Sequence, residues 1–175
     1  MTKVNKTDIP CISFVGRSKT GKTTVIEQLI PVLRERGFRV AVIKHHPHDF
    51  EIDKPGKDTY RYKQAGAVMS ILVSPYKVAV VKDSETRLNL RDIIARYVHD
   101  VDLLIIEGFK RENIPKIEVY ERKQGEESPV CWGDKNLIAL ISDYPVATGL
   151  PLFSRNDIDG VVEFVLRYLR DQQAS

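Results

Sequence analysis

A phosphate-binding pattern, Gly-x-x-x-x-Gly-Lys-Thr, begins at Gly16 and directly follows a short apolar run. Gly16 and Gly21 let the main chain curl so that its N–H groups point inward at an anion. Lys22 is placed to reach the β- and γ-phosphates of a nucleotide, and the Thr23 hydroxyl is placed to bind Mg²⁺. The residues expected to bind the nucleotide are Gly16, Arg17, Ser18, Lys19, Thr20, Gly21, Lys22, Thr23 and Thr24.

A carboxylate that completes such a site is expected at the end of another core strand, and the run "DLLIIEG" supplies one. Asp102 opens this run and Glu107 closes it, so at about 3.3 Å per residue their carboxylates are about 16 Å apart. Only one of them can face the phosphates. Ligands of α/β sheets bind at the carboxyl ends of the strands. We therefore predict Glu107 as the metal ligand, with Gly108 permitting close approach, and Asp102 as a surface residue.

A histidine-rich stretch follows the second apolar run, at another expected strand end. It leaves three interpretations open. Imidazole and carboxylate groups could bind a transition metal. Alternatively, this is a switch or substrate loop in which an aspartate acts through Mg²⁺-bound water or positions the attacking water. The third interpretation is a solvated loop. The residues concerned are His45, His46, His48, Asp49 and Asp53.

The elements that position these residues alternate along the chain, with short apolar runs separated by amphipathic stretches. Several runs are apolar on both faces, as in strands that helices cover on both sides. Pro31 should kink or divide the first helix. The alternation predicts an α/β fold, a P-loop NTPase-type three-layer sandwich with a mostly parallel sheet, as a single nucleotide-binding domain. Strands are expected at 11–15, 39–43, 68–73, 77–81, 102–107, 116–120 and 137–142, and helices at 21–36, 58–64, 88–97 and 157–170.

Composition narrows the function classes. The 175 residues carry a net charge of only +3, and the Lys and Arg residues are scattered, so nucleic acid is not an expected partner. No apolar run approaches the ~20 residues of a membrane helix, so no membrane role is expected either. Cys11 and Cys131 are far apart in the sequence and should be free thiols, which is typical of a cytoplasmic protein.

Base recognition is expected after the late strand 137–142. The stretch "NKTD", residues 5–8, has the form of a guanine-reading motif, but it precedes the first strand and so lies at the wrong end of the sheet. Asp143 follows the late strand at the correct end, where its carboxylate could accept hydrogen bonds from guanine. These residues alone leave ATP and GTP open.

Four stretches together resemble the molybdopterin-guanine dinucleotide biosynthesis adapter family, protein B (MobB): "GRSKTGKTT", "IKHHPHDFEIDKPGKD", "QAGA" and "DLLIIEGFK". The similarity runs from the first apolar run to roughly Lys110 and continues more weakly through "ALISD". The histidine stretch followed by Asp-x-Pro-Gly-Lys-Asp carries most of the specificity, because a phosphate loop alone occurs in many families.

The resemblance implies a GTP-binding P-loop protein of the same broad group as the nickel-chaperone GTPases, with weak GTP hydrolysis at most. It also implies a cytoplasmic homodimer that assists a partner molybdopterin guanylyltransferase, the enzyme that joins GMP to molybdopterin. By the same resemblance, residues 16–24 would bind GTP, and Thr23 and Glu107 would bind Mg²⁺. Asp49 would be a switch-type acid, which makes Lys22 and Asp49 the catalytic candidates.

Two other function classes stay open at this stage. In a small-molecule kinase, Asp49 would deprotonate an acceptor hydroxyl and the helix at 58–64 would form a lid. Kinase lids usually carry several arginines, whereas this chain has Arg61 and Arg87 but no Arg-rich stretch. A metal-delivery GTPase would instead use the histidines of the 45–48 stretch as ligands.

Overall fold

The computed structural model describes residues 9–122 and 128–173, so the "NKTD" stretch lies outside the described residues. Contacts divide the chain into two compact units. His46–Ile93 forms the second unit, and the rest of the chain forms the first. Each unit is described by itself, and the expectation of a single domain over 1–175 stays a prediction.

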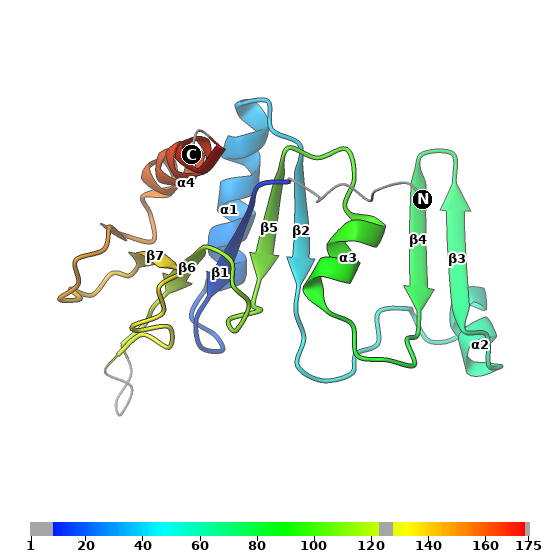
Figure 1. Ribbon diagram of the computed structural model, residues 1–175. Coiled ribbons are helices and arrows are strands. Elements are labelled where there is room, and N and C mark those ends of the chain that lie inside the picture. Colours follow the sequence, from blue (N-terminus) through cyan, green and yellow to red (C-terminus); the bar gives the residue numbers. More distant parts are fainter. Residues whose placement is uncertain (1–8, 123–127, 174–175) are drawn as a thin grey trace, which may run out of the picture. The chain divides into compact units, whose positions relative to one another are not determined.

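The first unit contains a six-stranded sheet in the order β2-β5-β1-β6-β7-β8, and every pair of neighbours is parallel (Figure 1). The predicted α/β fold with a mostly parallel sheet is confirmed. Because the strands are parallel, their carboxyl ends meet at one edge of the sheet. The strands are β1 (Cys11–Val15), β2 (Val40–Lys44), β5 (Leu103–Glu107), β6 (Lys116–Val119), β7 (Leu137–Ile141) and β8 (Leu152–Phe153).

Helices α1 (Lys22–Glu35) and α4 (Ile158–Gln173) pack against each other and cover one face of this sheet (Figure 1). Arg36, just after α1, donates a hydrogen bond to Glu163 at 2.6 Å and pairs with Asp159 at 3.4 Å. The main core lies between the helices and the sheet. Its fully buried members include Ile12, Phe14, Leu29, Leu33, Leu103, Ile105, Ile117 and Ile141.

Helix α1 continues through Pro31, so Pro31 does not divide it, and the alternative, a kink, stays a prediction. A proline inside a helix costs about 3 kcal/mol because it removes a hydrogen bond and crowds the preceding turn. Leu29 and Leu33, which flank it, are buried in the core and offset that cost. Gly37 follows the helix with φ 87°, and its N–H donates to the Arg34 carbonyl at 2.9 Å, as expected for a glycine cap.

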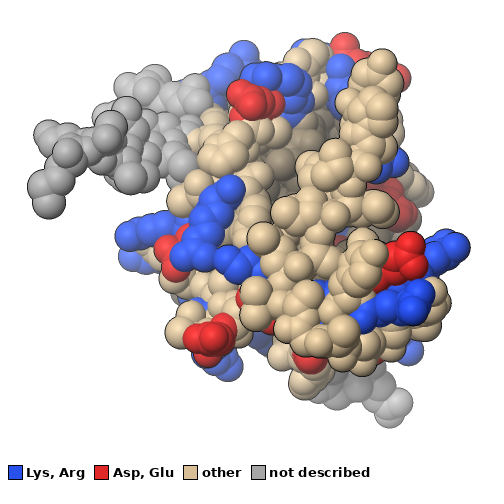
Figure 2. All heavy atoms as spheres, turned by 90° about the vertical axis from the view of Figure 1, so that its right-hand side faces the viewer, with Lys and Arg blue, Asp and Glu red and all other residues tan. Residues whose placement is uncertain are grey.

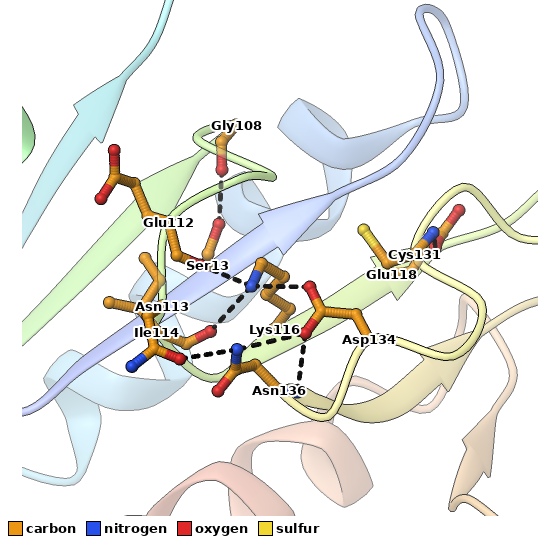
Figure 3. Close-up of polar contacts among 10 residues, drawn as sticks. All are labelled: Ser13, Gly108, Glu112, Asn113, Ile114, Lys116, Glu118, Cys131, Asp134 and Asn136. Carbon is orange, nitrogen blue, oxygen red and sulfur yellow. Dashed lines mark hydrogen bonds and ion pairs between the residues drawn. The ribbon is translucent and has the colours of Figure 1, made fainter.

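Strand β6 holds a segment of chain on the opposite face of the sheet through two buried charges (Figure 3). The Lys116 ammonium, 1% exposed, lies 3.0 Å from the Asp134 carboxylate. The Glu118 carboxylate accepts hydrogen bonds from Val130 N at 2.6 Å and Cys131 N at 2.8 Å. Because side chains alternate across a strand, the apolar residues of β6 face the helices while these charged ones anchor the segment.

The second unit contains an antiparallel hairpin of β3 (Met69–Ser74) and β4 (Lys77–Lys82), with α2 (Asp58–Gln64) before it. The strands predicted at 68–73 and 77–81 therefore exist but form a sheet of their own. The connection supplies the reason: Ser74 pairs with Lys77, and a two-residue link permits only antiparallel pairing. Helix α3 (Leu90–Tyr97) follows and spans the boundary between the units. In the part of the chain described, no helix is long and apolar enough to cross a membrane.

Candidate functional site

The phosphate loop lies between the end of β1 and the start of α1 and depends on glycine at its first position. Gly16 has φ 136°, and a Cβ there would lie 2.4 Å from the Val119 carbonyl oxygen. Gly21 has φ 86° and forms the N-cap of α1. The buried Thr20 hydroxyl donates to the Arg17 carbonyl at 3.1 Å, which ties the loop across its turn. The loop is thus packed directly against the end of β6.

Lys22 folds back over this loop. Its ammonium donates hydrogen bonds to the main-chain carbonyls of Gly16 at 3.2 Å and Arg17 at 2.5 Å. Burial lowers the pKa of Lys22 below its ordinary value, while the nearby Glu107 carboxylate opposes that shift. An anion bound in the loop would restore the favourable surroundings that burial removes. The geometry suits a lysine that exchanges main-chain partners for phosphate oxygens.

Three side chains from three elements converge beside the loop. The Thr23 hydroxyl of α1 lies 3.1 and 3.2 Å from the two carboxylate oxygens of Glu107, at the end of β5. The Lys44 ammonium, at the end of β2, lies 3.2 Å from the same carboxylate and 3.3 Å from the Thr23 hydroxyl. A hydroxyl and a carboxylate are hard oxygen ligands of the kind that Mg²⁺ prefers, so Thr23 and Glu107 fit that ion.

Main-chain contacts hold Glu107 in this position. Its carbonyl accepts a hydrogen bond from His45 N at 2.9 Å, and Gly108 N donates to the Phe14 carbonyl at 3.0 Å. The buried Ser13 hydroxyl donates to the Gly108 carbonyl at 2.6 Å (Figure 3). Gly108 has φ 103°, and a Cβ there would lie 3.1 Å from the His45 Cβ. The glycine therefore lets the chain turn tightly after β5.

Asp102 lies just before β5, at the end of that strand opposite Glu107. Its carboxylate accepts hydrogen bonds from the Arg39 main chain at 2.8 Å and from its guanidinium at 3.0 Å. These bonds lower the pKa of Asp102 from about 3.8 to about 2. The structure thus assigns Asp102 to an ion pair between β5 and the segment before β2.

Asp143 follows β7, and Arg155 follows β8. The main-chain N–H of Arg155 donates to Asp143 Oδ1 at 3.0 Å, and the Arg155 Nε lies 3.3 Å from Asp143 Oδ2. The other end of the guanidinium lies beside the phosphate loop, with Nη1 3.0 Å from the position of a Cβ on Gly21. Both oxygens of the predicted base-reading carboxylate therefore face Arg155. Base recognition by Asp143 stays a prediction.

The histidine stretch falls on both sides of the boundary between the units. The His45 ring, in the first unit, lies against the Phe109 ring at a centroid distance of 4.4 Å. In the second unit, His46 Nδ1 lies 3.0 Å from the His48 carbonyl, and the Asp49 carboxylate accepts a bond from the next main-chain N–H at 2.9 Å. Among residues 9–122 and 128–173, no group of three or more His, Cys, Asp or Glu side chains is arranged to hold a metal. The role of Asp49 stays a prediction.

Sequence reasoning missed two cations at this site, Lys44 and Arg155. Lys44 ends an apolar run at the same sheet edge as Glu107, so the rule that located Glu107 would also have located it. Arg155 had no such signal, because β8 has only two residues and leaves no pattern to recognise.

Residues 11–143 match the family model described as "Molybdopterin guanine dinucleotide synthesis protein B". A protein of Escherichia coli K12 named "Molybdopterin-guanine dinucleotide biosynthesis adapter protein" is 38% identical over 95% of this chain and 97% of its own length. A Haemophilus influenzae protein of the same name is 34% identical over 92% of this chain and 90% of its own.

Solved structures agree with these relatives. A crystal structure described as molybdopterin-guanine biosynthesis protein B (mobB) superposes with a TM-score of 0.72 at 31% identity and covers 90% of this chain and 99% of its own. Bacillus subtilis MobB superposes with a TM-score of 0.71 at 29% identity, over 90% of this chain and 96% of its own.

Proposed function

Because the chain belongs to the family of molybdopterin guanine dinucleotide synthesis protein B, we propose that it is a GTP-binding adapter in the synthesis of molybdopterin guanine dinucleotide. In this role it assists a partner guanylyltransferase that attaches GMP to molybdopterin, and it hydrolyses GTP slowly at most. We expect it to act in the cytoplasm. The observation that carries the proposal is the phosphate loop, with Lys22 folded over it at 2.5 and 3.2 Å from loop carbonyls.

The loop binds the triphosphate by three contributions. The main-chain N–H groups of the loop and the N-terminus of α1 would supply partial positive charge without a side chain. Lys22 adds a full charge, and its present acceptors, the carbonyls of Gly16 and Arg17, are neutral. A phosphate oxygen is a stronger acceptor than a carbonyl for an ammonium group. Lys22 therefore turns from the loop carbonyls to the β- and γ-phosphates when GTP binds.

Mg²⁺ accompanies the triphosphate, and Thr23 and Glu107 are the residues that would hold it. The ion would neutralise charge on the β- and γ-phosphates. Lys44 lies beside both residues and offers a second positive charge near the same position. Glu107 is shielded at 12% exposure, which strengthens its interactions with both cations.

A homodimer is part of the proposal, and the β3–β4 hairpin supports it. Within the described residues, each of these strands pairs only with the other, which leaves an unpaired edge on both. Uncharged residues cover a broad part of the surface drawn in Figure 2, with Lys, Arg, Asp and Glu side chains around it. Isolated two-stranded hairpins are marginally stable, so a second copy of the hairpin is the expected cover. The exposed apolar residues in and next to the hairpin are Val68, Met69, Ile71, Leu72, Val73, Tyr76, Val78 and Val80.

Sedimentation velocity tests the dimer. The unaltered protein should sediment as a dimer, and Leu72→Glu should sediment as a monomer at the same concentration, because it adds a charge to the apolar surface. Trp132→Glu changes an apolar residue of similar exposure outside the hairpin and should leave the dimer intact. A monomeric unaltered protein would remove the dimer from the proposal.

Reconstitution tests the adapter function. A purified molybdopterin guanylyltransferase, molybdopterin, GTP and Mg²⁺ are mixed with or without this protein, and the attached GMP is measured. The unaltered protein should raise the yield, Lys22→Ala should not, and the exposed Lys135→Ala should behave as the unaltered protein. Equal yields with and without the protein would count against the adapter function. Phosphoryl transfer to a metabolite faster than to water would indicate a kinase instead.

A further inference from the structure

Arg155 follows the last strand in the sheet order, β8, and its side chain extends to the phosphate loop. It lies two residues beyond β8, whereas the loop follows β1, three strands away in the sheet order. Its Nη1 nevertheless lies 3.0 Å from the position that a Cβ on Gly21 would take. Gly21 is the N-cap residue of α1, so the guanidinium lies over the N-terminus of that helix. The absence of a side chain at position 21 makes room for it.

Residues after two neighbouring strands, β7 and β6, contact Arg155 in this place. Its main-chain N–H and Nε face the two oxygens of Asp143 after β7, at 3.0 and 3.3 Å. Its Nη2 donates to the Tyr120 carbonyl after β6 at 3.5 Å, the limit of a hydrogen bond. The Nε contact lacks hydrogen-bond geometry. The guanidinium is thus directed at the phosphate loop, and its own contacts, with Tyr120 and Asp143, are weak.

We propose that Arg155 is a nucleotide-contacting residue whose guanidinium binds a phosphate of the nucleotide beside Gly21, and that Asp143 positions it. The inference rests on the proposed binding of a nucleoside triphosphate. A guanidinium presents several N–H donors in a planar fork that matches phosphate oxygens. At the N-terminus of α1 it adds to the field of the helix and of the loop N–H groups, all of which attract the same anion. Its side chain is 25% exposed, so water screens the charge only in part.

Phosphate is the partner that this placement favours over the base. Gly21 belongs to the phosphate loop, and an arginine beside it acts on any ligand with phosphates, whichever base is attached. Asp143, whose predicted reading of guanine stays a prediction, directs both carboxylate oxygens to Arg155. The pair therefore contributes affinity that does not depend on the base.

Calorimetric titration with GTP, ATP and inorganic tripolyphosphate, each with Mg²⁺, tests the inference. Arg155→Ala should weaken all three by a common factor of about tenfold or more, as expected for loss of a hydrogen bond between charged groups. Arg155→Lys should fall between this variant and the unaltered protein. Asp143→Asn should weaken all three ligands less than Arg155→Ala does, and Asp143→Glu should recover part of that loss.

Arg36→Ala is the matched control, because Arg36 also pairs with carboxylates and is 30% exposed but lies at the opposite end of α1. Its affinities should stay within about twofold of the unaltered protein. The inference fails if Arg155→Ala does the same, or if it weakens GTP while tripolyphosphate binding is unchanged. If Arg155→Ala does not fold, Arg155→Gln and Arg155→Lys decide by the same criteria. Failure of the unaltered protein to bind any nucleotide would remove the proposed function as well, whereas a null result in Arg155 variants alone removes only this inference.

Discussion

Substitution of the first loop glycine is the most direct test of how the phosphate loop is built. A Cβ on Gly16 would lie 2.4 Å from the Val119 carbonyl oxygen, whereas ordinary contacts begin near 3.4 Å, so the loop must move by about 1 Å. Its φ of 136° adds backbone strain of about 1–3 kcal/mol. Relief of the overlap adds a similar amount. We therefore expect Gly16→Ala to lower the free energy of unfolding by about 3 kcal/mol or more.

Gly37→Ala supplies the matched control, because Gly37 also has a positive φ, 87°, but nothing lies within 4 Å of its would-be Cβ. The Gly37→Ala variant should lose only the stability that the backbone strain costs, about 1 kcal/mol, which corresponds to a fall of about 2–4 °C in the melting temperature. Gly16→Ala should lose about 6–12 °C and also bind GTP at least tenfold more weakly, since the displaced N–H groups no longer converge. Urea unfolding and calorimetric titration measure the two quantities. Equal losses of stability in both variants, with unchanged GTP affinity, would refute the reasoning.

Three further predictions concern residues away from the loop. The neighbouring Arg39 guanidinium lowers the pKa of Asp102 from about 3.8 to about 2, so the ionised carboxylate stabilises the folded protein above pH 3.8, and this contribution is lost as the pH falls toward 2. In urea unfolding at a series of pH values, Asp102→Asn should make the free energy of unfolding depend less on pH between about 4 and 2. Lys116→Met removes the cation that pairs with Asp134 and should lower the free energy of unfolding by about 1.5 kcal/mol in urea, because Asp134 is 28% exposed and water can replace part of the contact; an unchanged free energy would contradict the assigned role. Burial raises the pKa of Cys131 to about 11, so a thiol reagent at neutral pH should modify it far more slowly in the folded protein than in urea, and equal rates would count against its burial.

Local patterns predicted much of the fold. The phosphate loop and α1 follow from residue types within a few positions of one another. Helix α1, Lys22–Glu35, differs from the predicted range 21–36 by one residue at each end. The strand at Leu103–Glu107 was recognisable because its residues are apolar on both faces. Pro31 was expected to kink or divide α1, and the structure excludes only the division, because burial of the helix against the sheet is not visible in its own sequence.

Which sheet a strand joins was harder to predict. The strands of the β3–β4 hairpin are rich in apolar and β-branched residues, as are those of the main sheet, so their pattern does not separate the two groups. The two-residue turn at 75–76 was the available signal, because it permits only antiparallel pairing. Strand β8 was missed because two residues are too few for any periodicity.

The amino-acid sequence by itself determined the position of the loop at 16–24, the α/β class and the placement of Glu107, not Asp102, beside that loop, because each depends on spacing within one segment or on the direction of one strand. The tertiary structure alone decided that Arg155 lies beside Gly21 and that Asp143 faces Arg155. Those contacts join strands whose order in the sheet differs from their order in the chain. Side chains far apart in sequence meet there only because packing of the core sets which strands are neighbours.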